Sequence, residues 1–154
     1  MSRSSNSRSN PQIRQIAAEV AEVYAWIDRR LAELASSRGV CRQCGKCCDF
    51  DSFDHRLYVT TAEWVYFRAA LADQPPRPMP LGRCPYNEEG VCLAHAIRFA
   101  GCRIFGCWLA AEVQSDLMQS SLTRLKAICV EHGLPYRYAD LRDALNGQWL
   151  DIGL

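Results

Sequence analysis

"CRQCGKCCDF" (residues 41–50) contains four cysteines, and two of them, Cys47 and Cys48, are direct neighbours. Two intervening residues let the sulfurs of Cys41 and Cys44 turn toward one ion, and Gly45 can adopt the positive φ that points backbone N–H groups at sulfur. Adjacent side chains diverge on most backbones, so we expect Cys47 and Cys48 to serve different centres, or one of them to be no ligand. The segment therefore needs partner thiols from elsewhere in the chain.

A second cysteine group follows a proline-rich loop, in "CPYNEEGVCLAHAIRFAGCRIFGC", residues 84–107. Eight thiols satisfy two four-thiolate sites, or one cluster with spare ligands. We expect the metal ligands to be Cys41, Cys44, Cys47, Cys48, Cys84, Cys92, Cys102 and Cys107. A metal that joins the two groups would cross-link the fold and contribute directly to its stability.

The composition indicates where these thiols act. Nine cysteines stand out in 154 residues, whereas 18 basic and 17 acidic residues leave a net charge of +1. No apolar run of signal-peptide length follows the polar start "MSRSSNSRSN", and no segment reaches the roughly 20 apolar residues that span a bilayer. We expect a cytoplasmic protein without membrane association, in which dense thiols indicate metal or redox chemistry. The balanced charge argues against a nucleic-acid partner.

Apolar residues recur at spacings of three and four from Ile13 to Leu34, which predicts a helix that begins at Asn10-Pro11 and ends near Gly39. We expect this stripe to pack on the rest of the domain, with docking to a protein partner as the alternative. The predicted organisation is a disordered N-terminus (1–9), an amphipathic helix (10–38), a cysteine-cluster metal-binding domain (39–108) and C-terminal helices packed on it (109–154).

Further elements follow from local patterns. "LYVT" predicts a short strand, and Thr60 and Glu63 have capping-box spacing for a helix that starts near Thr61. A longer helix is predicted over 108–131 and a last short one near Tyr138–Leu145. The buried face of the longer helix is expected at Leu109, Val113, Leu117, Leu122, Leu125 and Ile128. The predicted class is mainly α: a small helical domain organised around a cysteine-rich metal site, with irregular loops and one optional short strand.

Three kinds of residue outside the expected ligand set have alternative interpretations. His95 follows Cys92 by three residues, so both can face one ion from a helical turn, but a polar helix residue near the site has the same pattern. Cys129, alone in an apolar helical pattern, is expected to be a buried free cysteine, with a redox role as the alternative. Basic residues beside the ligands either compensate thiolate charge or are ordinary solvated charges: Arg42, Lys46, Arg83, Arg98 and Arg103.

Over roughly residues 38–108, the chain resembles the CxxCxxCC family of zinc- or iron-chelating domains, the YkgJ-like cysteine-cluster proteins. The resemblance rests on the first cysteine group with Gly45, then on "RCPYNEEGVC" and "RFAGCRIFGC". Phe99 and Gly106 stand where the family usually has proline, and Cys107 adds a thiol where many relatives have an apolar residue. The resemblance implies metal chelation by cysteines.

We therefore expect a cytoplasmic zinc- or iron-binding protein. One alternative is a 4Fe-4S protein in electron transfer or serving a partner enzyme, because C-x2-C-x2-C resembles the start of a ferredoxin-type run. The other is a metal-stapled interaction module that uses the N-terminal helix. No G-x-S-x-G, phosphate-binding glycine loop or H-E-x-x-H occurs, so no enzymatic activity is assigned. The choice of metal, the number of centres, the ligand roles of Cys107 and His95, and the oligomeric state stay open.

Overall fold

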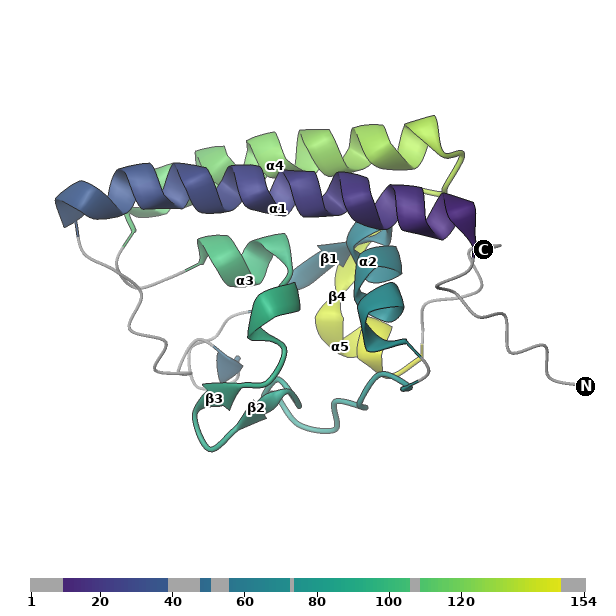
Figure 1. Cartoon of the computed structure of the whole chain (residues 1–154). Coiled ribbons are helices and arrows are strands. Elements are labelled where there is room, and N and C mark those ends of the chain that lie inside the picture. Colours follow the sequence, from purple (N-terminus) through teal and green to yellow (C-terminus); the bar gives the residue numbers. More distant parts are fainter. Residues whose placement is uncertain (1–9, 39–47, 51–55, 73, 106–108, 148–154) are drawn as a thin grey trace, which may run out of the picture.

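The computed structural model describes residues 10–38, 48–50, 56–72, 74–105 and 109–147, and this part of the chain is mainly helical, as predicted (Figure 1). The predicted disorder of residues 1–9 lies outside the described residues. The elements are α1 (Pro11–Arg38), β1 (Tyr58–Thr60), α2 (Thr61–Leu71), β2 (Asn87–Glu88), β3 (Val91–Cys92), the 3-10 turn η2 (His95–Ile97), α3 (Ala100–Ile104), α4 (Ala111–Glu131), β4 (Tyr138–Asp140) and α5 (Leu141–Leu145).

Helices α1 and α4 run antiparallel, side by side, and form one layer above the shorter elements (Figure 1). The Asn10 side chain caps α1 by accepting a hydrogen bond of 2.9 Å from the backbone N–H of Gln12. The Gln12 side-chain amide donates to the carbonyl of His132 at 3.1 Å, which joins the start of α1 to the end of α4. Within the described residues, no helix combines the length and apolar character required to span a membrane.

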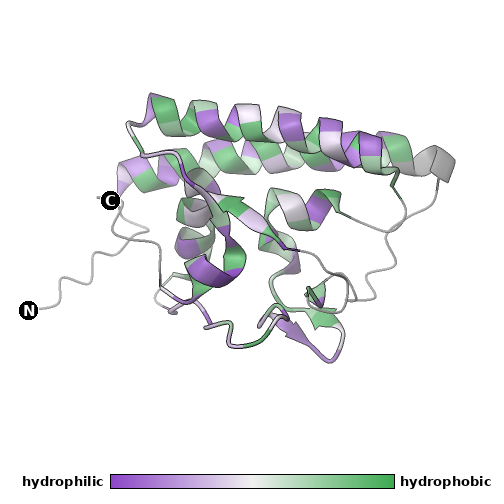
Figure 2. Ribbon diagram, turned by 180° about the vertical axis from the view of Figure 1, so that it is seen from behind, coloured by the Kyte–Doolittle hydropathy of each residue, from purple (hydrophilic) through white to green (hydrophobic). Residues whose placement is uncertain are grey.

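The apolar stripe of α1 is buried inside the chain from Ile13 to Ile27 and half-buried at Leu31 and Leu34. Apolar and polar residues alternate along the helix (Figure 2). It packs against α2, α3 and α4. The first core consists of Ile13, Ile16, Val20, Val23, Tyr24, Ile27, Ala62, Val65, Ala100, Ile104, Leu117, Met118, Leu125, Ile128, Cys129 and Leu134. The predicted buried face of α4 is confirmed at Leu117, Leu125 and Ile128, while Val113 and Leu122 are half-buried.

Helix α2 starts with the predicted capping box. Thr60 Oγ1 accepts from the backbone N–H of Glu63 at 3.3 Å, and Glu63 Oε2 accepts from the backbone N–H of Thr60 at 3.0 Å. The other oxygen, Oε1, accepts from the Tyr24 hydroxyl of α1 at 3.1 Å and from the backbone N–H of Ala100 of α3 at 2.6 Å. One buried carboxylate therefore links three helices.

The short strand predicted at "LYVT" is confirmed as β1, and it pairs antiparallel with β4. The helix predicted near Tyr138–Leu145 is wrong for its first three residues, which form β4. Asp140 Oδ1 accepts from the backbone N–H of Arg142 at 2.8 Å and so caps α5, which begins only at Leu141. Pairing with β1 satisfies the backbone of the preceding three residues, and local sequence pattern gives no sign of that partner.

A second core lies below the helical layer, between β1, α2, α3 and α5. Its buried residues are Leu57, Val59, Trp64, Phe67, Met79, Tyr86, Phe99, Leu141, Ala144 and Leu145. Two cysteines, Cys84 and Cys102, pack against its edge. The second core therefore supports the region to which the cysteines belong.

Candidate metal centre

A tight β-hairpin positions two cysteines of the second group. Strands β2 and β3 are joined by Glu89 and Gly90, whose φ angles of 52° and 84° are those of a two-residue type I′ turn. Cys92 lies opposite Asn87 in this hairpin, and the backbone N–H of Asn87 donates to the carbonyl of Cys84 at 3.0 Å. Cys84 and Cys92 therefore flank the same short ladder.

The end of the first cysteine group lies against the start of the second. The backbone N–H of Cys84 donates to the carbonyl of Cys48 at 3.0 Å, and that of Phe50 donates to the carbonyl of Gly82 at 2.8 Å. An antiparallel bridge between Asp49 and Arg83 lies between these bonds. The expected approach of the two groups is thus present in the part of the first group that the structure describes.

The fourth thiol, Cys102, comes from α3. Phe99 and Ala100 at the start of this helix are buried, and the sulfur of Cys102 accepts a hydrogen bond from the backbone N–H of Phe99. Helix α3 also packs against α1, so the position of Cys102 depends on both cores.

Every pair among Cys48, Cys84, Cys92 and Cys102 interacts electrostatically. Burial raises the pKa of the Cys84 thiol to about 11, with further contributions from Cys48 and Cys92. Burial also raises the pKa of Cys102 far above its ordinary value, followed by the effects of Cys84 and Cys48. These thiols are therefore protonated at neutral pH unless a positive charge is placed among them.

Backbone donors already point at several of these sulfurs. Cys84 accepts hydrogen bonds from the backbone N–H groups of Tyr86 and Asn87, and Cys92 accepts one from Ala94. Each bond lowers the thiol pKa, because it stabilises the thiolate form. The sequence predicts such bonds around Cys44 and Gly45, which lie outside the described residues; the structure shows them in the second group.

The described sulfurs do not form a closed coordination shell. Zn–S bonds of about 2.3 Å in a tetrahedron put the sulfurs about 3.8 Å apart. Among the described residues, no three cysteine sulfurs lie within 4.8 Å of one another; the group that meets this criterion is Glu19, Glu131 and His132. A metal held by the four cysteines must therefore draw their sulfurs together. Cys41, Cys44, Cys47 and Cys107 lie outside the described residues.

The structure separates two of the arginines that were expected near the thiols, Arg98 and Arg103. Burial raises the pKa of Cys92, and the charge of Arg98 offsets part of that rise, so Arg98 does act on the site. Arg103 is turned toward α1: its side chain, 6 % exposed, pairs with Asp28 at 2.8 Å and its guanidinium lies 4.3 Å from the centre of the Tyr24 ring. It serves the packing of α3 on α1.

His95 does not share a helical turn with Cys92, because Cys92 ends β3 and His95 starts a separate 3-10 turn. The spacing of three residues therefore gives no support to His95 as a ligand beside Cys92. Partial burial, Arg98 and Arg103 lower the pKa of His95. Cys129 is confirmed as a buried free cysteine, with no exposed surface.

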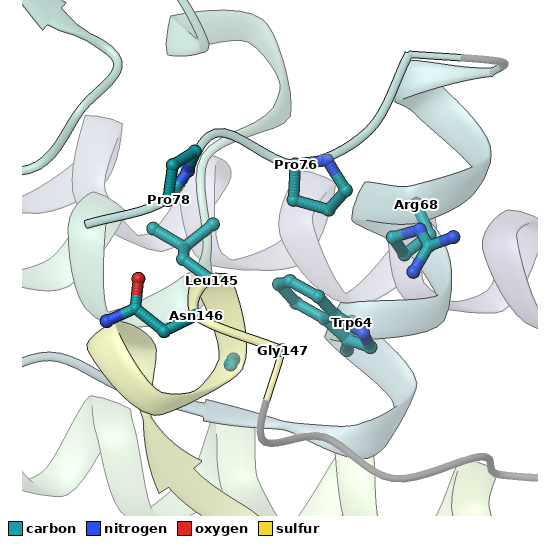
Figure 3. A pocket seen from close by; sticks show the side chains of 8 residues that line it. Trp64, Arg68, Pro76, Pro78, Leu145, Asn146 and Gly147 are labelled. Carbon is teal, nitrogen blue, oxygen red and sulfur yellow. The ribbon is translucent and has the colours of Figure 1, made fainter. Parts of the chain in front are cut away.

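A cavity of about 380 Å³ lies elsewhere, between α2, the proline-rich loop and the end of α5 (Figure 3). Trp64 and Arg68 contribute from α2, and Pro76 and Pro78 from the loop. The Asn146 amide at its rim is bonded to the backbone of Met79 at 2.7 and 3.0 Å. No cysteine of the described residues lines this cavity, so it adds nothing to the thiol site.

Sequence reasoning missed the group formed by Glu19, Glu131 and His132. Its members come from α1 and from the end of α4, with more than a hundred residues between them, and no local motif relates them. Glu131-His132 alone is an unremarkable dipeptide at a predicted helix end.

Comparison with known proteins adds no identification: no family model, curated protein or solved structure matches the chain.

Proposed function

We propose that this protein binds a zinc or iron ion through cysteine thiolates, with Cys48, Cys84, Cys92 and Cys102 as one ligand set. The observation that carries the proposal is the convergence of four thiols from three separate segments. Four thiolates complete the tetrahedral coordination that zinc prefers, and iron accepts the same ligands. Membership in the CxxCxxCC family is part of this proposal.

The hydrogen bonds to sulfur favour metal ligation over a cluster of inert thiols. The backbone N–H groups directed at Cys84 and Cys92 stabilise thiolate charge and fix the direction of each sulfur. The metal-free site keeps its thiols protonated by burial, whereas a divalent ion reverses that preference by supplying positive charge. Metal binding would then be coupled to proton release and to tighter packing around the hairpin.

Assigning Cys48 to this set implies a division of the first cysteine group. Cys48 then faces the hairpin, and its neighbour Cys47 belongs with Cys41 and Cys44, as expected for adjacent residues whose side chains diverge. The division leaves Cys107 as the fourth thiol for a second set. A partner-binding role for the apolar stripe of α1 is not proposed, because that stripe is buried in the first core.

The test is anaerobic purification followed by quantification of metal and acid-labile sulfide and by an absorption spectrum. We expect zinc or iron without sulfide in the wild type, and loss of metal in Cys84→Ala and Cys102→Ala. Cys129→Ala is the matched control, since it removes a thiol that is buried in the first core, and it should retain the metal. Protein without zinc or iron would refute the proposal, and stoichiometric sulfide would replace it with the 4Fe-4S alternative.

A further inference from the structure

A cluster of metal-ligating side chains separate from the cysteines lies where α1 meets the end of α4, in the helical layer (Figure 1). We propose that Glu19, Glu131 and His132 bind a divalent transition-metal ion of the zinc class, independently of the thiol site. One ligand atom from each residue lies within 4.8 Å of the other two.

The donor set suits such an ion. His132 Nε2 contacts Glu19 Oε2, and their side chains are only 13 % and 21 % exposed. One imidazole nitrogen and two carboxylate oxygens are ordinary ligands for zinc and its neighbours, which are often held by three protein groups and a water molecule. Because Glu131 is exposed, the fourth position is open to solvent.

The local charge favours a cation. Within the described residues, neither Glu19 nor Glu131 forms an ion pair with a lysine or arginine. Glu131 and His132 also lie at the C-terminal end of α4, where the helix dipole places partial negative charge. The two carboxylates match the charge of one divalent ion.

The backbone already holds His132 in place between the two helices. Its N–H donates to the carbonyl of Ile128 at 3.1 Å, and its carbonyl accepts from the Gln12 side chain at 3.1 Å. A ligand whose backbone is tied to both helices needs little reorganisation to bind an ion. The bound ion would clamp α1 to α4, the two helices that enclose the first core.

Equilibrium dialysis of Co²⁺ against the full-length protein as purified tests the proposal. We expect a cobalt site whose spectrum lacks the sulfur-to-cobalt charge-transfer absorption of a thiolate site. His132→Gln and Glu131→Gln should each weaken Co²⁺ binding by about tenfold or more. Glu22→Gln is the matched control, because it removes the same charge from an exposed position of α1 and should bind Co²⁺ as the wild type does.

Cys84→Ala separates this site from the thiol centre, since it should leave this cobalt site intact whatever it does to the metal content of the purified protein. Equal Co²⁺ binding by the wild type, His132→Gln and Glu131→Gln would show that His132 and Glu19 form an ion pair only. If His132→Gln fails to fold, the exposed Glu131→Gln decides the question.

Discussion

The Glu63 carboxylate accepts a hydrogen bond of 2.6 Å from the backbone N–H of Ala100, the first residue of α3. Cys102 follows two residues later in the same helix. Through its bond to the Tyr24 hydroxyl, Glu63 also holds α1. One buried side chain therefore connects the helical layer to the helix that carries a proposed metal ligand.

Glu63→Gln should destabilise the protein by about 1–3 kcal/mol, because it leaves a buried polar group without its partner. Both carboxylate oxygens accept hydrogen bonds, and the glutamine N–H group must oppose one of the donors on Thr60 or Ala100. Urea unfolding at several pH values measures the effect. Glu22→Gln, on the exposed face of α1, is the control and should change stability little.

The difference in stability between the wild type and Glu63→Gln should change with pH in a definite direction. Burial raises the pKa of Glu63 above 4.5, so the folded protein retains a proton that the unfolded chain has already lost. This contribution to stability is complete below pH 4.5 and is lost as pH rises through the folded pKa. The advantage of the wild type over Glu63→Gln should therefore shrink as pH rises from 4.5. A gap that widens over that range would mean that Glu63 is stabilised as the carboxylate.

The hydrogen bonds of Glu63 also show which contacts a sequence pattern can predict and which it cannot. Its capping role in α2 is predictable, because Thr60 and Glu63 are three residues apart in the chain. Its hydrogen bonds to Tyr24 and Ala100 join residues that are 39 and 37 positions away in the chain. No periodic pattern in the sequence predicts such contacts. The same limit explains β4, whose partner β1 is distant in sequence, and the group of Glu19, Glu131 and His132.

The approach of the two cysteine groups was predictable from the sequence, in contrast to these long-range contacts. Cysteine is rare, so its clustering is visible without knowledge of the fold, and the odd pair Cys47-Cys48 indicates that partners come from elsewhere. Which thiols lie in the same region depends on the backbone bond between Cys48 and Cys84 and on the type I′ hairpin. Both are long-range or turn-specific features that the spacing of cysteines does not determine.

Zinc added to metal-free protein near pH 7 should release about one proton per coordinated thiol. Burial raises the pKa values of Cys84, to about 11, and of Cys102, so both are protonated before the metal binds. Affinity should consequently fall as pH is lowered. Calorimetry in buffers with different ionisation enthalpies counts the protons. Release of less than one proton per zinc would contradict coordination by these thiols.

Gly101→Ala should cost about 1–3 kcal/mol, the usual range for overpacking a core. The new Cβ would lie 2.4 Å from Cδ1 of Leu57, a side chain that is 3 % exposed in the second core. Chemical unfolding of Gly101→Ala, Leu57→Ala and the double variant forms a cycle that isolates the contact. The double variant should be more stable than the sum of the two single changes indicates, since truncating Leu57 makes room for the methyl group. Strict additivity would exclude this clash as the cause.

Ile27→Asn should unfold the protein or destabilise it by more than about 3 kcal/mol, because it replaces a buried apolar side chain with a polar one. Ile27 has no exposed surface in the first core, whereas Ala25, two residues earlier on α1, is exposed. Ala25→Asn is therefore the matched control and should cost well under 1 kcal/mol through helix propensity. Circular dichroism during thermal unfolding compares the two. Since α3 packs on α1, Ile27→Asn should also release the metal for which Cys102 is a proposed ligand. A folded, metal-loaded Ile27→Asn variant would instead mean that the stripe of α1 serves a partner rather than the core.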